Sequence, residues 1–277
     1  MIPLPLPPTG RTISDPTASG LADGTAPGGG GGTVVLWSED ATRFEGLVSA
    51  RAGRDGGDGG LIEVSGRKQL AFSGQADASA PKGQAGMLLL DPGNLVVAET
   101  GGSNFNAVGS DATVAANSIS DTLRGGTAVT LRADDDIAIQ AVIDGRPFNG
   151  SSGGSGGGGL HLLAGGSVAV DKSIVLNDGA FSSVSERGTF TQADGALIAT
   201  LGKQSIAVSA VGDVTTRYLL TSGDIDLRSA GGNVTALTTI GGATQPVGSF
   251  SATAKAGTVR VENGLQTSGG ASFDAAA

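Results

Sequence analysis

The sequence predicts an all-β fold, a parallel β-helix (β-solenoid) in which one short β unit repeats along the chain. An apolar tetrad that begins at Val34 returns at Leu61 and again at Met87, after 27 and then 26 residues. Farther along, pairs of short alternating strands are joined by small polar turns. Glycine, the residue of tight turns, accounts for 49 of the 277 residues. A fixed period within about 20–50 residues is typical of solenoids.

The stretch 32–92 carries the first three copies of the repeat. A glycine precedes each tetrad, namely Gly32, Gly60 and Gly86. In the first two copies a second short strand and a small-residue segment follow, with residues 42–44 above 70–72 and residues 47–50 above 75–78. Glycine-rich turns at 53–60 and 81–86 occupy the same place in the repeat. Turn chemistry and strand pattern therefore agree.

Residues 1–31 are rich in proline, glycine, serine and threonine. Proline removes backbone donors and glycine adds chain entropy, so we expect a disordered or irregular N-terminal arm. Residues 32–277 are expected to form the β-helix. Within it, residues 150–159 read as a Gly/Ser-rich excursion rather than a domain boundary, because the strands on both sides follow one plan.

The second half of the chain repeats a strand, a small polar turn and another strand. Alternation at period two places one face inward and leaves Arg132, Asp226 and Arg228 outside. Five copies are readable, at residues 128–139, 160–170, 206–214, 225–234 and 250–261. With ~20–27 residues per coil, the chain makes about ten coils and a rod roughly 45–50 Å long.

Two other structures were weighed against the β-helix. A pair of β-sandwiches would need a hairpin turn closing every strand pair, and the Asp-Gly and Asn-Gly pairs of this chain occur irregularly. Helical periodicity is weak throughout, apart from a single turn expected at 119–123 with Ser118 as its cap. We therefore expect a β-helix with little or no helix.

Composition excludes several function classes. The net charge is −9 with no basic cluster, which argues against nucleic-acid binding. With 0 cysteines, disulfides, thiolate metal sites and cysteine nucleophiles are excluded. No run approaches the ~20 apolar residues of a membrane span. The stretch from Met1 to Pro8 is broken by prolines and reads as a poor signal peptide, so no export signal is visible.

Two motifs suggest catalysis or metal binding. Residues 153–157 fit the G-x-S-x-G pattern beside the only histidine, His161, but a nucleophile elbow needs a strand before it and a helix after it. Asp134, Asp135 and Asp136 could form a calcium site or a carboxylate pair for glycoside cleavage. Other copies of the repeat hold glycines in that slot, which favours a solvated turn, and calcium binding there stays open.

Further residues with possible functions receive structural interpretations. Residues 56–61 resemble a calcium-binding nonapeptide, a motif that works in tandem but stands alone here. Trp37, Phe44 and Phe72 are expected in the core or in stacked columns rather than on a sugar-binding platform. The sequence thus predicts no catalytic, cofactor-binding or metal-binding residue, and no cofactor.

Residues 21–143 resemble the filamentous haemagglutinin family of large exoproteins. The resemblance rests on residues 22–26, 34–38, 42–53, 56–66 and 86–92, and continues at 119–123, 126–131 and 136–139, in the family's order. From residue 160 onward the likeness is generic repeat character. The family's N-terminal secretion domain, with its signal peptide and Asn-Pro-Asn-Gly-type motif, has no counterpart here. The chain also stops within a repeat, so we expect an internal or truncated segment.

The resemblance implies a right-handed β-helix rod of a Gram-negative bacterium, exported by two-partner secretion through an outer-membrane pore protein. It implies a secreted or cell-surface location and a role in adhesion or biofilm formation, with an unidentified glycan or protein receptor. We expect a non-enzymatic rod and contact surface. The alternatives are a β-helix polysaccharide-cleaving enzyme centred on the acidic turn at Asp134, Asp135 and Asp136, and a truncated product with no independent role.

Overall fold

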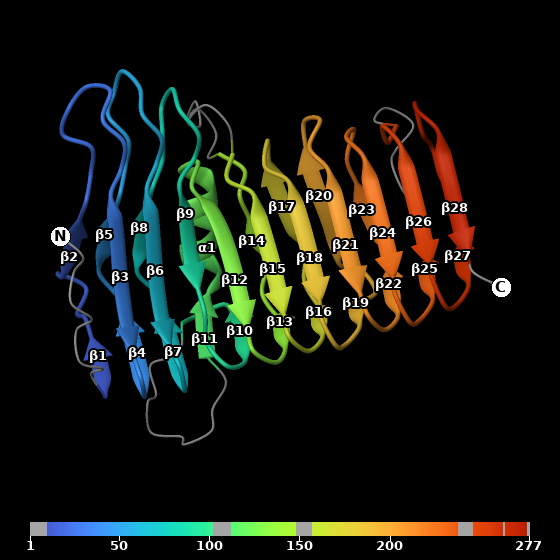
Figure 1. Cartoon of the computed structure of the whole chain (residues 1–277), viewed down its shortest axis with the longest axis horizontal. Coiled ribbons are helices and arrows are strands. Elements are labelled where there is room, and N and C mark those ends of the chain that lie inside the picture. Colours follow the sequence, from blue (N-terminus) through green and yellow to red (C-terminus); the bar gives the residue numbers. More distant parts are fainter. Residues whose placement is uncertain (1–9, 102–111, 148–156, 238–245, 263, 276–277) are drawn as a thin grey trace.

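The computed structural model describes residues 10–101, 112–147, 157–237, 246–262 and 264–275. These residues form a parallel β-helix, as predicted, in which every strand pair runs parallel and consecutive coils stack along one axis (Figure 1). The chain advances along the axis as it winds, in the right-handed sense usual for parallel crossovers. The first and last coils lie at opposite ends of the rod.

The ten-stranded sheet runs the length of the rod and faces the viewer in Figure 1. Nine spacings of ~4.8 Å make it roughly 43 Å long, close to the expected length. Along the axis its strands are β3 (Thr33–Ser38), β6 (Leu61–Gly66), β9 (Met87–Leu90), β12 (Ala128–Ala133), β15 (Leu160–Ala164), β18 (Phe181–Ser185), β21 (Ile206–Ala210), β24 (Ile225–Ser229), β26 (Phe250–Ala254) and β28 (Ala271–Ala275).

The eleven-stranded sheet forms the second wall. One strand lies out of chain order: β11 follows β10 in the sequence but lies between β7 and β10 in the sheet, so this coil is longer than its neighbours. Along the axis the strands are β1 (Arg11–Ile13), β4 (Ala41–Phe44), β7 (Gln69–Phe72), β11 (Ala112–Ala115), β10 (Leu95–Ala98), β13 (Ile137–Ile139), β16 (Val168–Val170), β19 (Phe190–Gln192), β22 (Val214–Thr216), β25 (Val234–Ala236) and β27 (Val259–Val261).

The third wall is divided by a helix. A three-stranded sheet covers the N-terminal coils and a four-stranded sheet covers the later ones, with the helix α1 (Ala116–Arg124) packed against β8 and β14. The strands are β2 (Ser19–Leu21), β5 (Leu47–Ser49), β8 (Gln75–Asp77), and then β14 (Ile143–Asp144), β17 (Ile174–Asn177), β20 (Leu197–Leu201) and β23 (Tyr218–Leu220).

The core consists of columns of apolar side chains that continue from coil to coil. One column of the ten-stranded sheet is in register over eight strands and each member is at most 1% exposed: Ile62, Leu88, Val129, Leu160, Phe181, Ile206, Ile225 and Phe250. Phe44 and Phe72 stack with ring centroids 5.7 Å apart. Each such side chain contributes ~1.5–3 kcal/mol by leaving water. Stacking therefore supplies the burial that one strand lacks.

The predicted alignment of the first two tetrads is wrong by one residue. Val34 pairs with Ile62 rather than with Leu61, and the preceding glycines align instead, since Leu61 N–H donates to the Gly32 carbonyl at 3.0 Å. With this register Val34 and Leu36 pack against the core. A slip of one residue would have turned them to solvent.

The boundary of the predicted arm is also wrong. Residues 10–21 contain two short strands, since β1 pairs with β4 and β2 pairs with β5, and these strands begin a first coil. Residues 22–31 form turns and extended segments without a strand. A short strand can form here despite many turn residues because the next coil supplies a complete backbone template. Residues 1–9 lie outside the described part.

The short helix exceeds the single turn expected at 119–123. Helix α1 spans nine residues, and Ser118 lies within it rather than at its N-cap, which is Ala115 without a side-chain cap bond. Its polar side chains take the place of a missing strand. Ser120 Oγ accepts the Asp144 N–H at 3.0 Å, and Thr127 Oγ1, just past the helix, accepts the Ala78 N–H at 2.8 Å.

Two smaller expectations concern the outside of the rod. Of the predicted excursion at 150–159, residues 150–156 lie outside the described part, while Gly158 donates to the Leu123 carbonyl at 3.1 Å. Arg132, Asp226 and Arg228 all point away from the core, as predicted. No helix in the described part of the chain has the length and apolar character needed to cross a bilayer.

Candidate functional site

The acidic turn joins β12 to β13, and its three aspartates serve different bonds. Asp136 Oδ1 accepts the backbone N–H of Ser167 in the next coil at 2.6 Å. The Asp135 carboxylate pairs with Arg187 at 3.2 Å, and the Asp134 backbone carbonyl accepts from the same guanidinium at 2.7 Å. The turn is thus largely engaged in bonds between coils, which fits the interpretation as a solvated structural turn.

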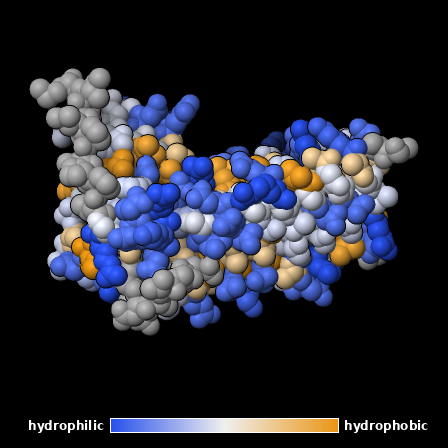
Figure 2. All heavy atoms as spheres, turned by 60° about the horizontal axis from the view of Figure 1, so that its bottom comes forward, coloured by the Kyte–Doolittle hydropathy of each residue, from blue (hydrophilic) through white to orange (hydrophobic). Residues whose placement is uncertain are grey.

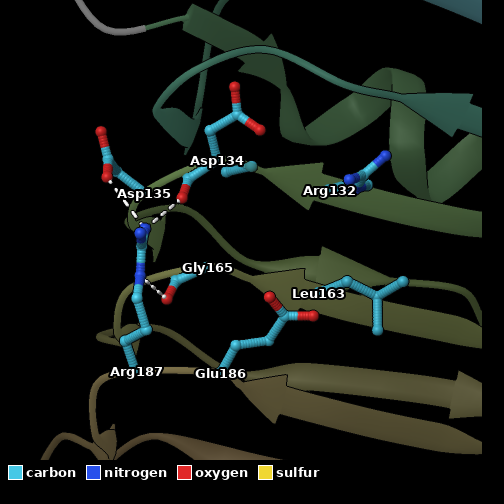
Figure 3. A pocket seen from close by; sticks show the side chains of 8 residues that line it. Arg132, Asp134, Asp135, Leu163, Gly165, Glu186 and Arg187 are labelled. Carbon is cyan, nitrogen blue, oxygen red and sulfur yellow. Dashed lines mark hydrogen bonds and ion pairs between the residues drawn. The ribbon is translucent and has the colours of Figure 1, made fainter.

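A hollow of about 400 Å³ opens beside this turn (Figure 3). Arg187 lies at its edge, where Nε also donates to the Gly165 carbonyl at 2.8 Å. Leu163 forms an apolar part of the lining, and the carboxylate of Glu186 points toward it, while that of Asp134 points away from Arg187 (Figure 3). The hollow spans three successive coils, and its carboxylates and arginines come from the first and the third of them.

One carboxyl next to this hollow has a perturbed proton affinity. Burial raises the pKa of Asp91, and the Arg132 guanidinium, 3.2 Å from Asp91 Oδ2, opposes that rise. Nearby Asp134 and Glu63 raise it further. A carboxyl of raised pKa is a feature of general acids. Here the carboxylate is held in an ion pair, which ties it to the neighbouring coil.

The described residues contain no group of three histidine, cysteine, aspartate or glutamate side chains placed to hold a metal ion. In the nonapeptide-like segment at 56–61, Asp58 forms hydrogen bonds with the backbone of neighbouring coils. Asp58 Oδ1 accepts the Gln84 N–H at 2.8 Å, and the Asp58 carbonyl accepts the Gly31 N–H at 2.8 Å. Both bonds join neighbouring coils.

The only histidine forms a pair that the sequence analysis missed. His161 Nδ1 lies 2.7 Å from Ser182 Oγ, on the outward face of adjacent strands β15 and β18. Burial lowers the pKa of His161, which favours the neutral ring. A Ser–His nucleophile needs a third group to orient the base, and the described contacts of His161 include no carboxylate. The G-x-S-x-G residues 153–156 lie outside the described part.

The aromatic residues divide into two groups. Phe44 and Phe72 are buried, as expected. Trp37 is 40% exposed, so the expectation of a core position is wrong for it. It occupies an outward position of β3, opposite Ser65 of the next coil, which is the consequence of the corrected register. Together with Val35, 53% exposed, it forms a small apolar patch near the N-terminal end.

The outward face of the ten-stranded sheet runs the length of the rod. One of its rows is in register over seven coils and includes two arginines: Arg132, Leu163, Val184, Ser209, Arg228, Thr253 and Asp274. A second hollow lies over β18, β21 and β24, lined in part by Ser182, Ala207 and Asp226. The face shown in Figure 2 is mostly polar, with hydrophobic side chains in small separate groups.

The polar groups of this surface thus serve mainly to join coils. Arg132 bonds to Asp91 and Arg187 to Asp135, each across coils, whereas Arg228 bonds to Asp226 within the same strand β24. No known protein-family profile and no curated protein matches this chain.

Proposed function

We propose that this chain is a non-enzymatic rod segment of a secreted or surface-exposed adhesin-like exoprotein. It acts as a spacer and as a contact surface in adhesion or biofilm formation. The observation that supports this role most directly is the continuous stack of coils, in which outward polar side chains such as Asp136, Arg132 and Arg187 bond to neighbouring coils. The likeness to filamentous haemagglutinins supports the same role.

That likeness extends the proposal to export and to the partner. An outer-membrane pore protein of a Gram-negative bacterium would carry the rod to the surface, and a surface glycan or protein would be the receptor. A β-helix suits such a path because each coil needs only its predecessor as a template, so that coils can form one after another.

Removal of whole coils tests the proposal. Deleting residues 181–224 joins Ala180 to Ile225 and removes two complete coils, because Phe181, Ile206 and Ile225 are in register. The rod should fold and become shorter by ~10 Å. Cells displaying the full-length protein should attach to a surface, the shortened rod should retain part of that attachment, and cells lacking the segment should lose it.

The alternatives are distinguished in the same strains. Attachment that is unchanged without the segment would favour a product with no independent role. The purified chain should leave a panel of acidic and neutral polysaccharides uncut. Cleavage that disappears when Asp134, Asp135 and Asp136 are replaced by Asn would overturn the proposal in favour of a polysaccharide-cleaving enzyme.

A further inference from the structure

A row of polar residues lies along one edge of the eleven-stranded sheet, each directly before the first residue of a strand. Seven successive strands of this sheet, from β10 to β27, each follow directly after a residue whose side chain carries a hydrogen-bond acceptor. We call these residues the polar ladder: Asn94, Asp136, Ser167, Thr189, Asp213, Asn233 and Thr258. The residue types differ, but the position does not.

The ladder side chains bind the backbone of the following coil. At five of the six steps, the side-chain oxygen of one member accepts the backbone N–H of the next. The bonds are Asp136 N–H to Asn94 Oδ1 at 3.0 Å, Ser167 N–H to Asp136 Oδ1 at 2.6 Å, Thr189 N–H to Ser167 Oγ at 3.1 Å, Asn233 N–H to Asp213 Oδ1 at 2.7 Å and Thr258 N–H to Asn233 Oδ1 at 2.9 Å.

Each ladder residue is also held through its carbonyl group. The Asp136 carbonyl accepts the N–H of Leu95, and the Ser167 carbonyl accepts that of Ile137, both at 3.0 Å. Five of the ladder residues therefore have the N–H bonded to a side chain and the C=O bonded to a strand of the same preceding coil. Because a backbone N–H without a partner is costly, this double attachment selects one position for each new coil.

One step of the ladder differs from the others. Within the described ladder, the step from Thr189 to Asp213 has no side-chain bond, although Phe190 N–H still donates to the Asp213 carbonyl at 2.9 Å. The methyl of Thr189, not its hydroxyl, approaches the next turn, since a Cβ on Gly212 would lie 2.9 Å from it. Buried Gln192 ties these coils instead, accepting the Arg217 N–H at 2.8 Å and donating to the Tyr218 carbonyl at 2.9 Å.

We propose that the polar ladder registers each coil on the one before it, and that buried Gln192 takes over this role at the Thr189–Asp213 step. The proposal does not depend on the proposed function. It explains why the turns before the sheet differ in sequence while the strands after them stay in register.

Amide hydrogen exchange of the full-length chain, resolved by NMR, tests the registering role. Replacing Asp136 by Ala removes a charged acceptor, so the Ser167 amide should exchange about tenfold faster. Asp134→Ala, in the same turn but outside the ladder, is the matched control and should leave that amide unchanged. Asn233→Ala, read at the Thr258 amide, supplies a second variant should Asp136→Ala fail to fold. Equal exchange in variants and control would overturn the registering role.

A gain of protection tests the registering role at the exceptional step. Thr189→Asn places an amide oxygen where the missing acceptor would lie, so the Asp213 amide should exchange about fivefold more slowly. Thr191→Asn, on the outward face of β19, is the control and should have no such effect. Equal exchange of the Asp213 amide in the two variants would count against the registering role.

Discussion

The N-terminal and C-terminal coils solve the same stacking problem with different side chains. Before α1, coils of 28 and 26 residues are tied by ion pairs such as Arg67–Glu39 and Lys68–Asp40. After α1, coils as short as 19 residues are tied largely by the polar ladder. Exposed ion pairs are screened by salt, whereas ladder bonds join a side chain to backbone. Both regions thus share the backbone hydrogen bonding between coils, whereas the side-chain interactions that join the coils differ between them.

The largest expected effect concerns close backbone contacts in the N-terminal coils. A Cβ on Gly60 would lie 1.9 Å from the Gly32 carbonyl oxygen, a backbone atom that cannot give way. Gly60→Ala should therefore lower the free energy of unfolding by about 3–5 kcal/mol, measured by urea denaturation. Gly28→Ala is the control, because nothing lies within 4 Å of a Cβ there. Equal losses of unfolding free energy in the two variants would show that the close backbone contact at Gly60 does not determine the stability of these coils.

The second largest loss of stability should follow from replacing Gln192, a buried side chain that hydrogen-bonds two C-terminal coils to each other. Gln192 is 1% exposed and its amide also donates to the Ala196 carbonyl at 2.8 Å. Gln192→Leu leaves the Arg217 N–H and two carbonyls without that partner, which should cost about 2–3 kcal/mol. Thr191→Leu, outward on the same strand, should cost far less. Thermal unfolding compares the two, and similar melting temperatures would contradict a tie at this position.

The ion pair between Asp23 and Arg51, which joins two N-terminal coils, should make the melting temperature depend on pH. Burial raises the pKa of Asp23, but bonds from the Arg51 guanidinium and the Ser49 hydroxyl outweigh it, so the pKa lies below its ordinary value. The stabilisation is present above the unfolded-state pKa of ~3.9 and is lost as the pH falls through the folded-state pKa. The melting temperatures of the native chain and of Asp23→Asn should converge on acidification from pH 7. A constant difference would contradict this.

The smallest effect should come from two exposed ion pairs of the N-terminal coils, Arg67–Glu39 and Lys68–Asp40. Arg67→Ala combined with Lys68→Ala should lower the melting temperature by no more than about 2 °C at low salt. Raising NaCl from ~0.1 M to ~1 M should remove most of that difference, because the Debye length falls to ~3 Å. Asn233→Ala, in the ladder, should keep its full effect at both salt concentrations. A salt-sensitive loss in the ladder variant would erase the distinction between the two regions.

The sequence predicted the architecture because solenoid burial repeats along the chain. Period, glycine turns and alternating strands are local patterns, and they located the strand pairs from β12 to β27 that begin at Ala128, Leu160, Ile206, Ile225 and Phe250. The first tetrad was misaligned because its residues are all apolar, so alternation could not distinguish Val34 from Val35. The glycines would have distinguished them, since Gly32 aligns with Gly60.

Features that depend on contacts between coils escaped the sequence analysis. The pair of His161 and Ser182 arises from register across two strands, and no local pattern marks it. The polar ladder has four residue types at one structural position, so no repeated letter signals it. Helix α1 carries no side-chain cap and is short, and its packing against β8 and β14 supplies the stability that its sequence lacks. The acidic turn, by contrast, could be predicted as a turn because the other repeats have glycines at the same position.

The unequal lengths of the coils have a consequence for how such a molecule changes in size. Successive strands of the ten-stranded sheet are separated by 31 residues at one step and by 19 at another, yet each step adds one rung of ~4.8 Å. The length of the rod therefore depends on the number of coils and not on the number of residues in each coil. Insertions in a turn would widen the outline of the rod without moving what lies beyond it, whereas a duplicated coil would lengthen its reach by one fixed increment.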